Sequence, residues 1–185
     1  MSLKEFFLKR RSIRAFGEKQ ITAEQINMLF DTCKWAPSSY NEQPWMYYYA
    51  FKENSTAFEK FIDCLVDANQ KWAKNAQVMM MSVGRIINSQ TNKENKYFMH
   101  DVGAANAYLC LEAAALGFQA HQMAGFDTNK AIETFQLDKS LYFPVTFIAI
   151  GYAADLETLP ENVRIAETSP RKRKENSLFT KEIAD

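Results

Sequence analysis

The chain has 185 residues, with 22 basic and 22 acidic side chains and 47% hydrophobic residues. This length is typical of one domain with a substantial core. Because the charges balance, no overall field favours nucleic acid or an anionic membrane, and only a local cluster could support such a function.

The cysteines and the N-terminal residues indicate the compartment. Cys33, Cys64 and Cys110 are scattered, odd in number and form no CxxC pair, which is typical of a reducing compartment. The opening MSLKEFFLKRR lacks the apolar stretch of a secretory signal. The longest apolar run, residues 144–154, is too short to span a bilayer. We therefore expect a cytoplasmic protein without a membrane segment.

Two helices are predicted in the first 36 residues. Residues 2–10 form a short amphipathic helix with Leu3, Phe6 and Phe7 on one face. In the second helix, residues 21–36, Thr22 and Gln25 have the spacing of a capping box and Pro37 ends the pattern. The apolar stripe of this helix comprises Ile26, Leu29, Phe30 and Cys33.

The middle of the chain predicts strands and helices in alternation. Aromatic-rich residues 45–51 favour a strand, and residues 56–76 a helix in one or two pieces. Residues 77–84 favour a buried strand, although their methionine run also suits a helix. Residues 97–117 predict a helix that is small or apolar on nearly every face, with Gly117 as its stop. Such a helix needs cover on all sides, and we expect a second subunit to supply part of it.

The last third of the chain predicts two more strands and an arm. Residues 118–123 and 143–153 favour strands, and residues 125–137 a turn and a helix with Asp127 or Thr128 as its cap. From Leu159 onward, prolines and charges replace apolar periodicity, so residues 159–185 predict an arm outside the core. Together these elements indicate one α+β domain over residues 1–185.

Common catalytic patterns are absent from the sequence. It contains no GxGxxG, GxxxxGK[ST] or GxSxG motif. His100 and His121 have no cysteine or carboxylate partners at metal-ligand spacing, so no metal site is predicted. We therefore expect the chemistry of an active site to belong to a bound organic cofactor.

Three stretches carry candidate binding groups. RRSIRAF, residues 10–16, offers guanidinium and hydroxyl groups that match phosphate oxygens, although a solvated helix end is the alternative. PRKRK, residues 170–174, suits a solvated tail and lacks the interleaved aromatics of a nucleic-acid site. APSSYNEQPW, residues 36–45, offers hydroxyls and amides that suit a planar ring with carbonyls and ring nitrogens, or an ordinary turn.

These stretches occur in order with HDVGAANAYLCLEAAALGF, QMAGF and FIAIGYA, and together they resemble the FMN-dependent nitroreductase family. The resemblance implies a mostly antiparallel sheet flanked by helices, and a homodimer that exchanges C-terminal arms. It implies bound FMN, NAD(P)H as co-substrate, and a ping-pong reduction of small nitroaromatic, quinone or related electron-poor acceptors. In the reaction that it implies, the chemistry takes place at the flavin and needs no catalytic side chain. From the residues of PRKRK we expect no nucleic-acid partner.

The resemblance also implies the site residues. The FMN phosphate would be held by Arg10, Arg11, Ser12, Arg14, Arg171 and Arg173. A loop from the partner subunit would lie against the ring through Pro37, Ser38, Ser39, Asn41 and Gln43. Backbone N–H groups near the ring would come from Met123, Ala124 and Gly125.

Four further residues have weaker assignments. Lys71, with Lys74 as its rival, would stabilise negative charge on the ring, but a solvated lysine is the alternative for both. Tyr40 and Phe126 could stack on acceptors, although core packing also suits Phe126. The alternative functions are a specialised flavin dehydrogenase of this fold, a non-catalytic FMN-binding or redox-sensing protein, and a nucleic-acid or interaction module that uses PRKRK.

Overall fold

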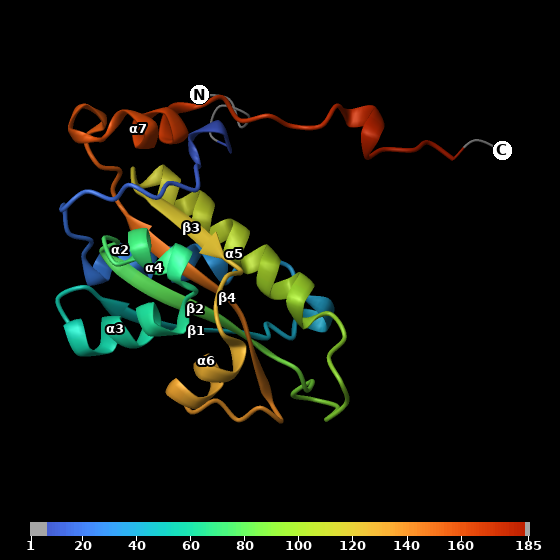
Figure 1. Ribbon diagram of the computed structural model, residues 1–185. Helices are drawn as coiled ribbons and strands as arrows, with labels where there is room; N and C mark the ends of the chain where they lie inside the picture. The colour runs from blue at the N-terminus through green and yellow to red at the C-terminus, as the bar shows by residue number, and fades with distance from the viewer. Residues whose placement is uncertain (1–6, 184–185) are drawn as a thin grey trace.

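Four antiparallel strands form the centre of the structure, a computed structural model that describes residues 7–183 (Figure 1). Their order in the sheet is β1-β2-β4-β3, so that β1 and β3 lie at the edges. The strands are β1 (Trp45–Phe51), β2 (Val78–Arg85), β3 (Gln119–Met123) and β4 (Tyr142–Gly151). The strands predicted from the sequence are confirmed, including the methionine run in β2.

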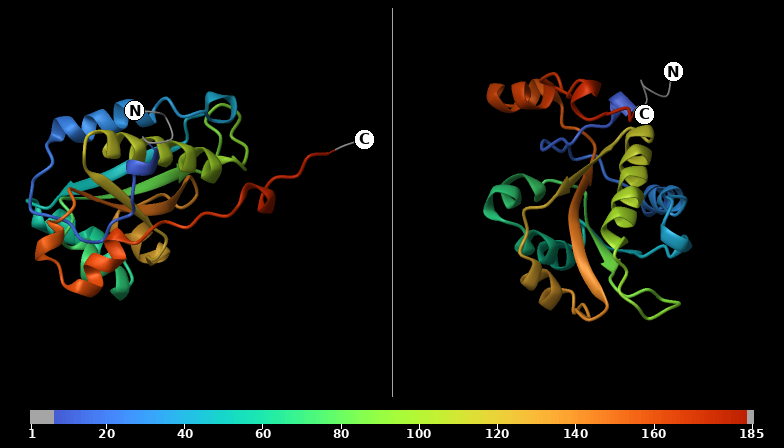
Figure 2. Two further views of the ribbon diagram at one scale, coloured as in Figure 1. Left: turned by 90° about the horizontal axis from the view of Figure 1, so that it is seen from above. Right: turned by 90° about the vertical axis from the view of Figure 1, so that its right-hand side faces the viewer.

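Helices cover both faces of this sheet, as Figure 2 shows from the side. One face carries α2 (Ala23–Cys33) and α5 (Phe98–Ala115). The other carries α3 (Ser55–Cys64), α4 (Asp67–Ala73) and α6 (Thr128–Thr134). The helix predicted over residues 56–76 is therefore two helices, and the α+β class with a flanked antiparallel sheet is confirmed.

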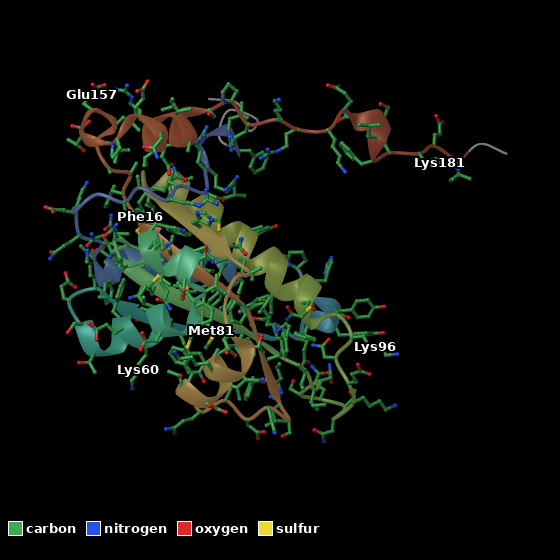
Figure 3. All side chains as sticks on the ribbon, in the orientation of Figure 1. Phe16, Lys60, Met81, Lys96, Glu157 and Lys181 are labelled. Atoms are coloured by element: carbon green, nitrogen blue, oxygen red, sulfur yellow. The ribbon has the colours of Figure 1, made fainter. Side chains whose placement is uncertain are left out.

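Alternation along β2 explains how one strand serves two cores. Val78 and Met80 pack with α2 and α5, whereas Met79 and Met81 pack with α3, α4 and α6. Successive side chains of a strand point to opposite faces, and all four are fully buried. Met81, labelled in Figure 3, lies in the interior beneath the ribbon of these helices. A strand buried on both sides reads as a continuous apolar run, which is why its period was ambiguous.

The predicted capping features are present. The Thr22 hydroxyl oxygen accepts the backbone N–H of Gln25, and the Gln25 side-chain oxygen accepts the backbone N–H of Thr22. These two bonds complete a capping box. Asp127, rather than Thr128, caps α6 by accepting the Lys130 N–H at 3.0 Å. Gly117 follows α5 with a φ of +89°, in the left-handed region that glycine adopts readily.

The described part of the first predicted helix agrees with the prediction to within one residue, whereas the C-terminal segment differs from it. Residues 2–6 of the predicted first helix lie outside the described residues, and the helical turn at residues 7–9 ends at Lys9. Beyond the sheet, residues 161–168 form a helix, α7 (Glu161–Thr168), where an irregular arm was expected. None of its residues is buried, so the prediction that this segment stays outside the core holds.

Past α7 the chain leaves the body of the molecule. Figure 1 and the left view of Figure 2 show residues 172–183 extending away from the sheet, and Lys181 in Figure 3 lies far out on this segment. Leu178 and Phe179 are 71% and 65% exposed. Among the described residues, no helix is long and apolar enough to cross a membrane.

Candidate functional site

The arginine segment, residues 10–16, does not continue the helical turn that precedes it. After Lys9 the chain runs irregularly to Phe16, which forms an isolated antiparallel bridge with Ala153. Ile13 and Phe16 are buried and anchor the segment on the sheet, while Ser12 and Arg14 are exposed. Arg10 and Arg14 therefore do not share a helix face.

The two basic clusters meet at this segment. Arg10, Arg11, Arg171 and Arg173 line one cavity of about 560 Å3, and the other described residues that line it are Phe7, Leu8 and Leu111. The Arg171 guanidinium donates to the carbonyls of Arg10 and Leu8. Arg11 donates to the Ser169 carbonyl at 3.0 Å. Residues far apart in the sequence are thus fastened side by side.

The positive charges of the residues that line this cavity suit a bound anion. Partial desolvation lowers the pKa of the Arg171 guanidinium, and the positive charges of Arg10, Arg11 and Arg173 lower it further. No acidic residue is among the described residues that line the cavity. Four converging guanidinium groups repel one another unless an anion offsets them, and their planar donors match phosphate oxygens. The residues therefore fit a phosphate dianion.

A second cavity, of about 480 Å3, lies between this segment, α4 and α7. Its cationic lining residues are Arg11, Arg14 and Lys71, and its aromatic ones are Phe16 and Trp72. The Arg14 guanidinium lies 5.9 Å from the Trp72 ring centroid. Lys71 lines this cavity, whereas its rival Lys74 caps the C-terminus of α4.

A third, smaller cavity of about 230 Å3 connects Arg10 and Ser12 to β3 and α5. It is also lined by Cys110 and Gln122, and Gln122 Nε2 lies 3.4 Å from Cys110 Sγ. Burial raises the pKa of the Cys110 thiol to about 11, so the thiol is protonated at neutral pH.

The turn after β3 is held tightly by its neighbours. Thr146 Oγ1 donates to the Met123 carbonyl at 2.7 Å. The Gly125 carbonyl accepts from the Val66 N–H and from Asn69 Nδ2, each at 3.1 Å. A Cβ on Gly125 would meet Asn69 Nδ2 at 2.7 Å, so a larger residue there would displace the Asn69 side chain from its bond to the Gly125 carbonyl. The Ala124 side chain is exposed, and Phe126 packs on Phe147 in the core with ring centroids 4.8 Å apart.

The Pro37–Gln43 loop has a strained backbone. Tyr40, Asn41 and Gln43 have φ values of +53°, +55° and +48°, in a region that non-glycine residues rarely adopt. Ser38 Oγ accepts the Gln43 N–H at 3.0 Å and closes the loop, while Tyr40 is 90% exposed. Strain of this kind persists where the surroundings hold it, often at binding sites.

One subunit does not bring this loop to the arginines. The Ser39 N–H donates to Asp101 in the first turn of α5 at 3.0 Å, whereas Arg10 shares its cavities with Cys110 and Leu111, farther along α5. Asp101 and Cys110 are nine residues apart on α5, which corresponds to about 14 Å at 1.5 Å per residue. The predicted site is therefore split along α5, with its loop at the first turn of the helix and its phosphate-binding part beside Cys110 and Leu111.

Several residues at the site were not found by sequence reasoning. The arginine segment is contacted by Trp72, Gln119, His121 and Glu167. Gln119 and His121 belong to a short predicted strand, but nothing in its alternation shows what their side chains bind. Glu167 lies on α7. This helix was not predicted, because the prolines and charged residues around it indicated an irregular arm.

Comparison with known proteins identifies relatives along most of the chain. Residues 8–152 match the sequence profile of the nitroreductase family. A Bacillus subtilis (strain 168) protein, provisionally named NAD(P)H nitroreductase YdgI, is 26% identical over 82% of this chain and 88% of its own length.

Solved structures agree with that match. An oxidoreductase containing FMN is 31% identical, with a TM-score of 0.88 over 98% of this chain and 92% of its own. A nitroreductase from Exiguobacterium sibiricum 255-15, solved in complex with FMN, has a TM-score of 0.80 at 19% identity and covers 99% of this chain and 98% of its own. The second likeness shows the fold alone.

Proposed function

Because this chain belongs to the nitroreductase family, we propose that it is an FMN-dependent oxidoreductase. It takes electrons from NAD(P)H and reduces small electron-poor acceptors, such as nitroaromatics and quinones. The reaction follows a ping-pong scheme, in which the oxidised nucleotide leaves before the acceptor binds. The convergence of Arg10, Arg11, Arg171 and Arg173 on one cavity is the structural observation that most directly supports it.

The residues fit the proposed cofactor in charge and in shape. Arg10, Arg11, Ser12, Arg14, Arg171 and Arg173 would hold its phosphate, where guanidinium and hydroxyl donors are concentrated. Lys71, on the wall of the adjoining cavity, would stabilise negative charge on the ring. Met123, Ala124 and Gly125 would offer backbone N–H groups from a turn that its neighbours already hold rigid.

When bound, FMN supplies the ring that accepts hydride from the nucleotide and returns electrons to the acceptor. The protein's own residues bind and orient that ring and set its electrostatic surroundings. The buried Cys110 thiol is protonated, and no side chain is assigned as a general acid or base. The exposed Tyr40 could stack on acceptors, whereas Phe126 serves the core.

We propose that the protein acts as a homodimer. The loop that carries Pro37, Ser38, Ser39, Asn41 and Gln43 reaches the ring only from the partner subunit, because α5 separates it from the arginines of its own chain. One stripe of α5 supports this proposal, since it is apolar yet solvent-facing: Met99 and Tyr108 are 51% and 39% exposed, and Gly103 and Ala107 are exposed beside them. Isologous contacts bury such a patch twice.

The arm exchange is restricted to the last residues. Residues 161–173 stay with their own chain through Glu167, Ser169 and Arg171, and through Arg173, which lines the cavity of Arg10. Only the extended residues 174–183 are therefore free to reach a partner. Their exposed Leu178 and Phe179 and the open edge of β1 support that exchange.

The remaining proposals concern domain organisation and location. Both hydrophobic clusters pack on one sheet, which supports a single domain over residues 1–185. The three cysteines are free and buried, which supports a cytoplasmic location.

Absorption spectroscopy of the purified protein tests the function. The expected result is flavin bands that bleach anaerobically with NADH or NADPH and return when a nitroaromatic or quinone is added. Bands that resist both nucleotides would favour a specialised dehydrogenase or a non-catalytic flavin protein. Colourless protein that binds no added FMN would contradict the proposal.

A further inference from the structure

The segment that carries Arg10, Arg11 and Arg14 has no helix or strand of its own to fix its backbone. Its side chains can converge on an anion only if its N–H and C=O groups are held from outside. The Arg171 guanidinium donates to the Arg10 carbonyl, and the Ala154 backbone N–H donates to the Ala15 carbonyl. Further partners are side chains of β3 and α7, and the family resemblance assigns no role to any of these side chains.

Two partners lie on β3. Gln119 uses both ends of its amide: Oε1 accepts the Arg11 N–H at 2.8 Å, and Nε2 donates to the Lys9 carbonyl at 3.2 Å. Two residues later, His121 Nδ1 lies 2.7 Å from the Ile13 carbonyl oxygen. A carbonyl can only accept, so Nδ1 carries the proton. These two residues fix the first half of the segment.

The third partner lies on α7, beyond the part of the chain that matches the family profile. Glu167 Oε1 accepts the N–H groups of both Arg14 and Ala15, at 2.8 and 3.2 Å. Hydrogen bonds to a charged acceptor are shorter and stronger than those between neutral groups. This carboxylate therefore fixes the second half of the segment, immediately around Arg14.

From these contacts we infer that Glu167, assisted by Gln119 and His121, is a positioning residue that holds the arginine segment ready for the cofactor phosphate. The inference rests on the proposed function for the identity of the anion. Holding the backbone before binding reduces the ordering cost of binding. It also explains the otherwise unexpected helix α7, which carries the carboxylate to the segment.

A competing explanation of the Glu167 contacts predicts the opposite change in phosphate affinity when the carboxylate is removed. Glu167 lines the same cavity as Arg11, Arg14 and Lys71, and consecutive backbone N–H groups can bind anions. If its carboxylate merely occupied the place of an anion, its removal would strengthen phosphate binding. Loss of its negative charge favours an anion on electrostatic grounds alone. Weaker binding after truncation can therefore not be a charge effect.

The experiment compares Glu167→Ala and Glu167→Gln in the full-length holoprotein, with Glu161→Ala, an exposed glutamate of the same helix, as the control. Flavin fluorescence released on dilution measures the Kd for FMN, and competition measures the affinity for riboflavin, which lacks the phosphate. We expect Glu167→Ala to raise the Kd for FMN about tenfold, the effect of losing hydrogen bonds to a charged group. Its riboflavin affinity should change far less.

Rescue separates positioning from general damage. Glutamine keeps an acceptor oxygen without the charge, so Glu167→Gln should recover most of the loss. A Glu167→Ala protein that binds FMN as tightly as the wild type, or more tightly, overturns the inference, and so does a Glu167→Gln protein as weak as Glu167→Ala. Wild-type protein without FMN affinity would overturn the proposed function as well, which distinguishes the two failures.

A second variant covers the case in which Glu167→Ala does not fold. Gln119→Met has a similar volume but loses both bonds to the segment. We expect it to raise the Kd for FMN and to leave the riboflavin affinity nearly unchanged. Equal losses for both ligands, or no loss for FMN, would contradict the positioning role.

Discussion

Trp72 of α4 and His121 of β3 lie ring against ring, with centroids 4.5 Å apart and planes inclined by 31°. The same Trp72 ring stacks at 6.2 Å with Phe16 and lies beneath the Arg14 guanidinium. One indole thus links a helix, an edge strand and the arginine segment. Trp72, Phe16 and Arg14 also line the same cavity.

The burial of the His121 ring in this cluster predicts that the stability of the protein depends on pH. Burial lowers the pKa of His121 below its ordinary 6.5, and the nearby positive charges of Arg14 and Arg10 act in the same direction, against Glu167 and the bond to Ile13. Between the lowered pKa and 6.5 the unfolded chain binds more protons than the folded one. The free energy of unfolding therefore falls as the pH drops below about 6.5 and is fully restored above it.

Urea denaturation from about pH 5.5 to 7.5 measures this slope. His121→Gln keeps an amide donor for the Ile13 carbonyl but cannot take up a proton. We expect the variant to lose the part of the slope that His121 contributes. An identical slope in variant and wild type would show that another group is responsible.

The two arginine clusters predict a shared effect on FMN retention. Arg14→Ala and Arg173→Ala should each raise the Kd for FMN about tenfold, the usual effect of losing a charged hydrogen-bond donor. Lys172→Ala is the matched control, because this exposed neighbour does not line the cavity of Arg173. The ratio of flavin to protein after gel filtration measures retention. A double variant that retains FMN normally would contradict the assignment of the site.

The turn after β3 predicts a steric effect at Gly125. A methyl group there would approach Asn69 Nδ2 to 2.7 Å and Val66 Cγ2 to 3.0 Å. Gly125→Ala should therefore lower the free energy of unfolding by about 1–3 kcal/mol, as other overpacked sites do. The adjacent Ala124→Ser, at an exposed side chain, should change it by less than about 0.5 kcal/mol. Equal stability of the two variants would argue against a tightly packed turn.

The exposed stripe of α5 predicts the response of the dimer to a charge. Ala107 lies on this stripe, and Ala107→Glu would bury two carboxylates at a two-fold contact. We expect sedimentation to show dissociation into monomers, together with loss of FMN. Ala68→Glu, at an exposed position of α4, should remain dimeric. A dimeric Ala107→Glu protein would exclude this face as the interface.

Local patterns in the sequence predicted most of the fold. The Thr22–Gln25 capping box, the Asp127 cap and the Gly117 stop depend on neighbours within a few residues, and all three are present. The strands and helices of residues 21–153 follow from local periodicity in the same way. The described end of the first helix, at Lys9, agrees with the prediction to within one residue. The helix α7 was not foreseen, because it lies among prolines and charged residues and buries no apolar face.

The sequence by itself determined the residue types of the proposed site: the arginines of residues 10–14 and 171–173, and the polar loop at residues 37–43. Only the tertiary structure decided that the two basic clusters share a cavity, that α5 separates the loop from them, and that Glu167, Gln119 and His121 hold the segment. The physical reason is distance along the chain. Helix and strand patterns report interactions between close neighbours, whereas a side chain that satisfies a distant backbone N–H leaves no periodic signal.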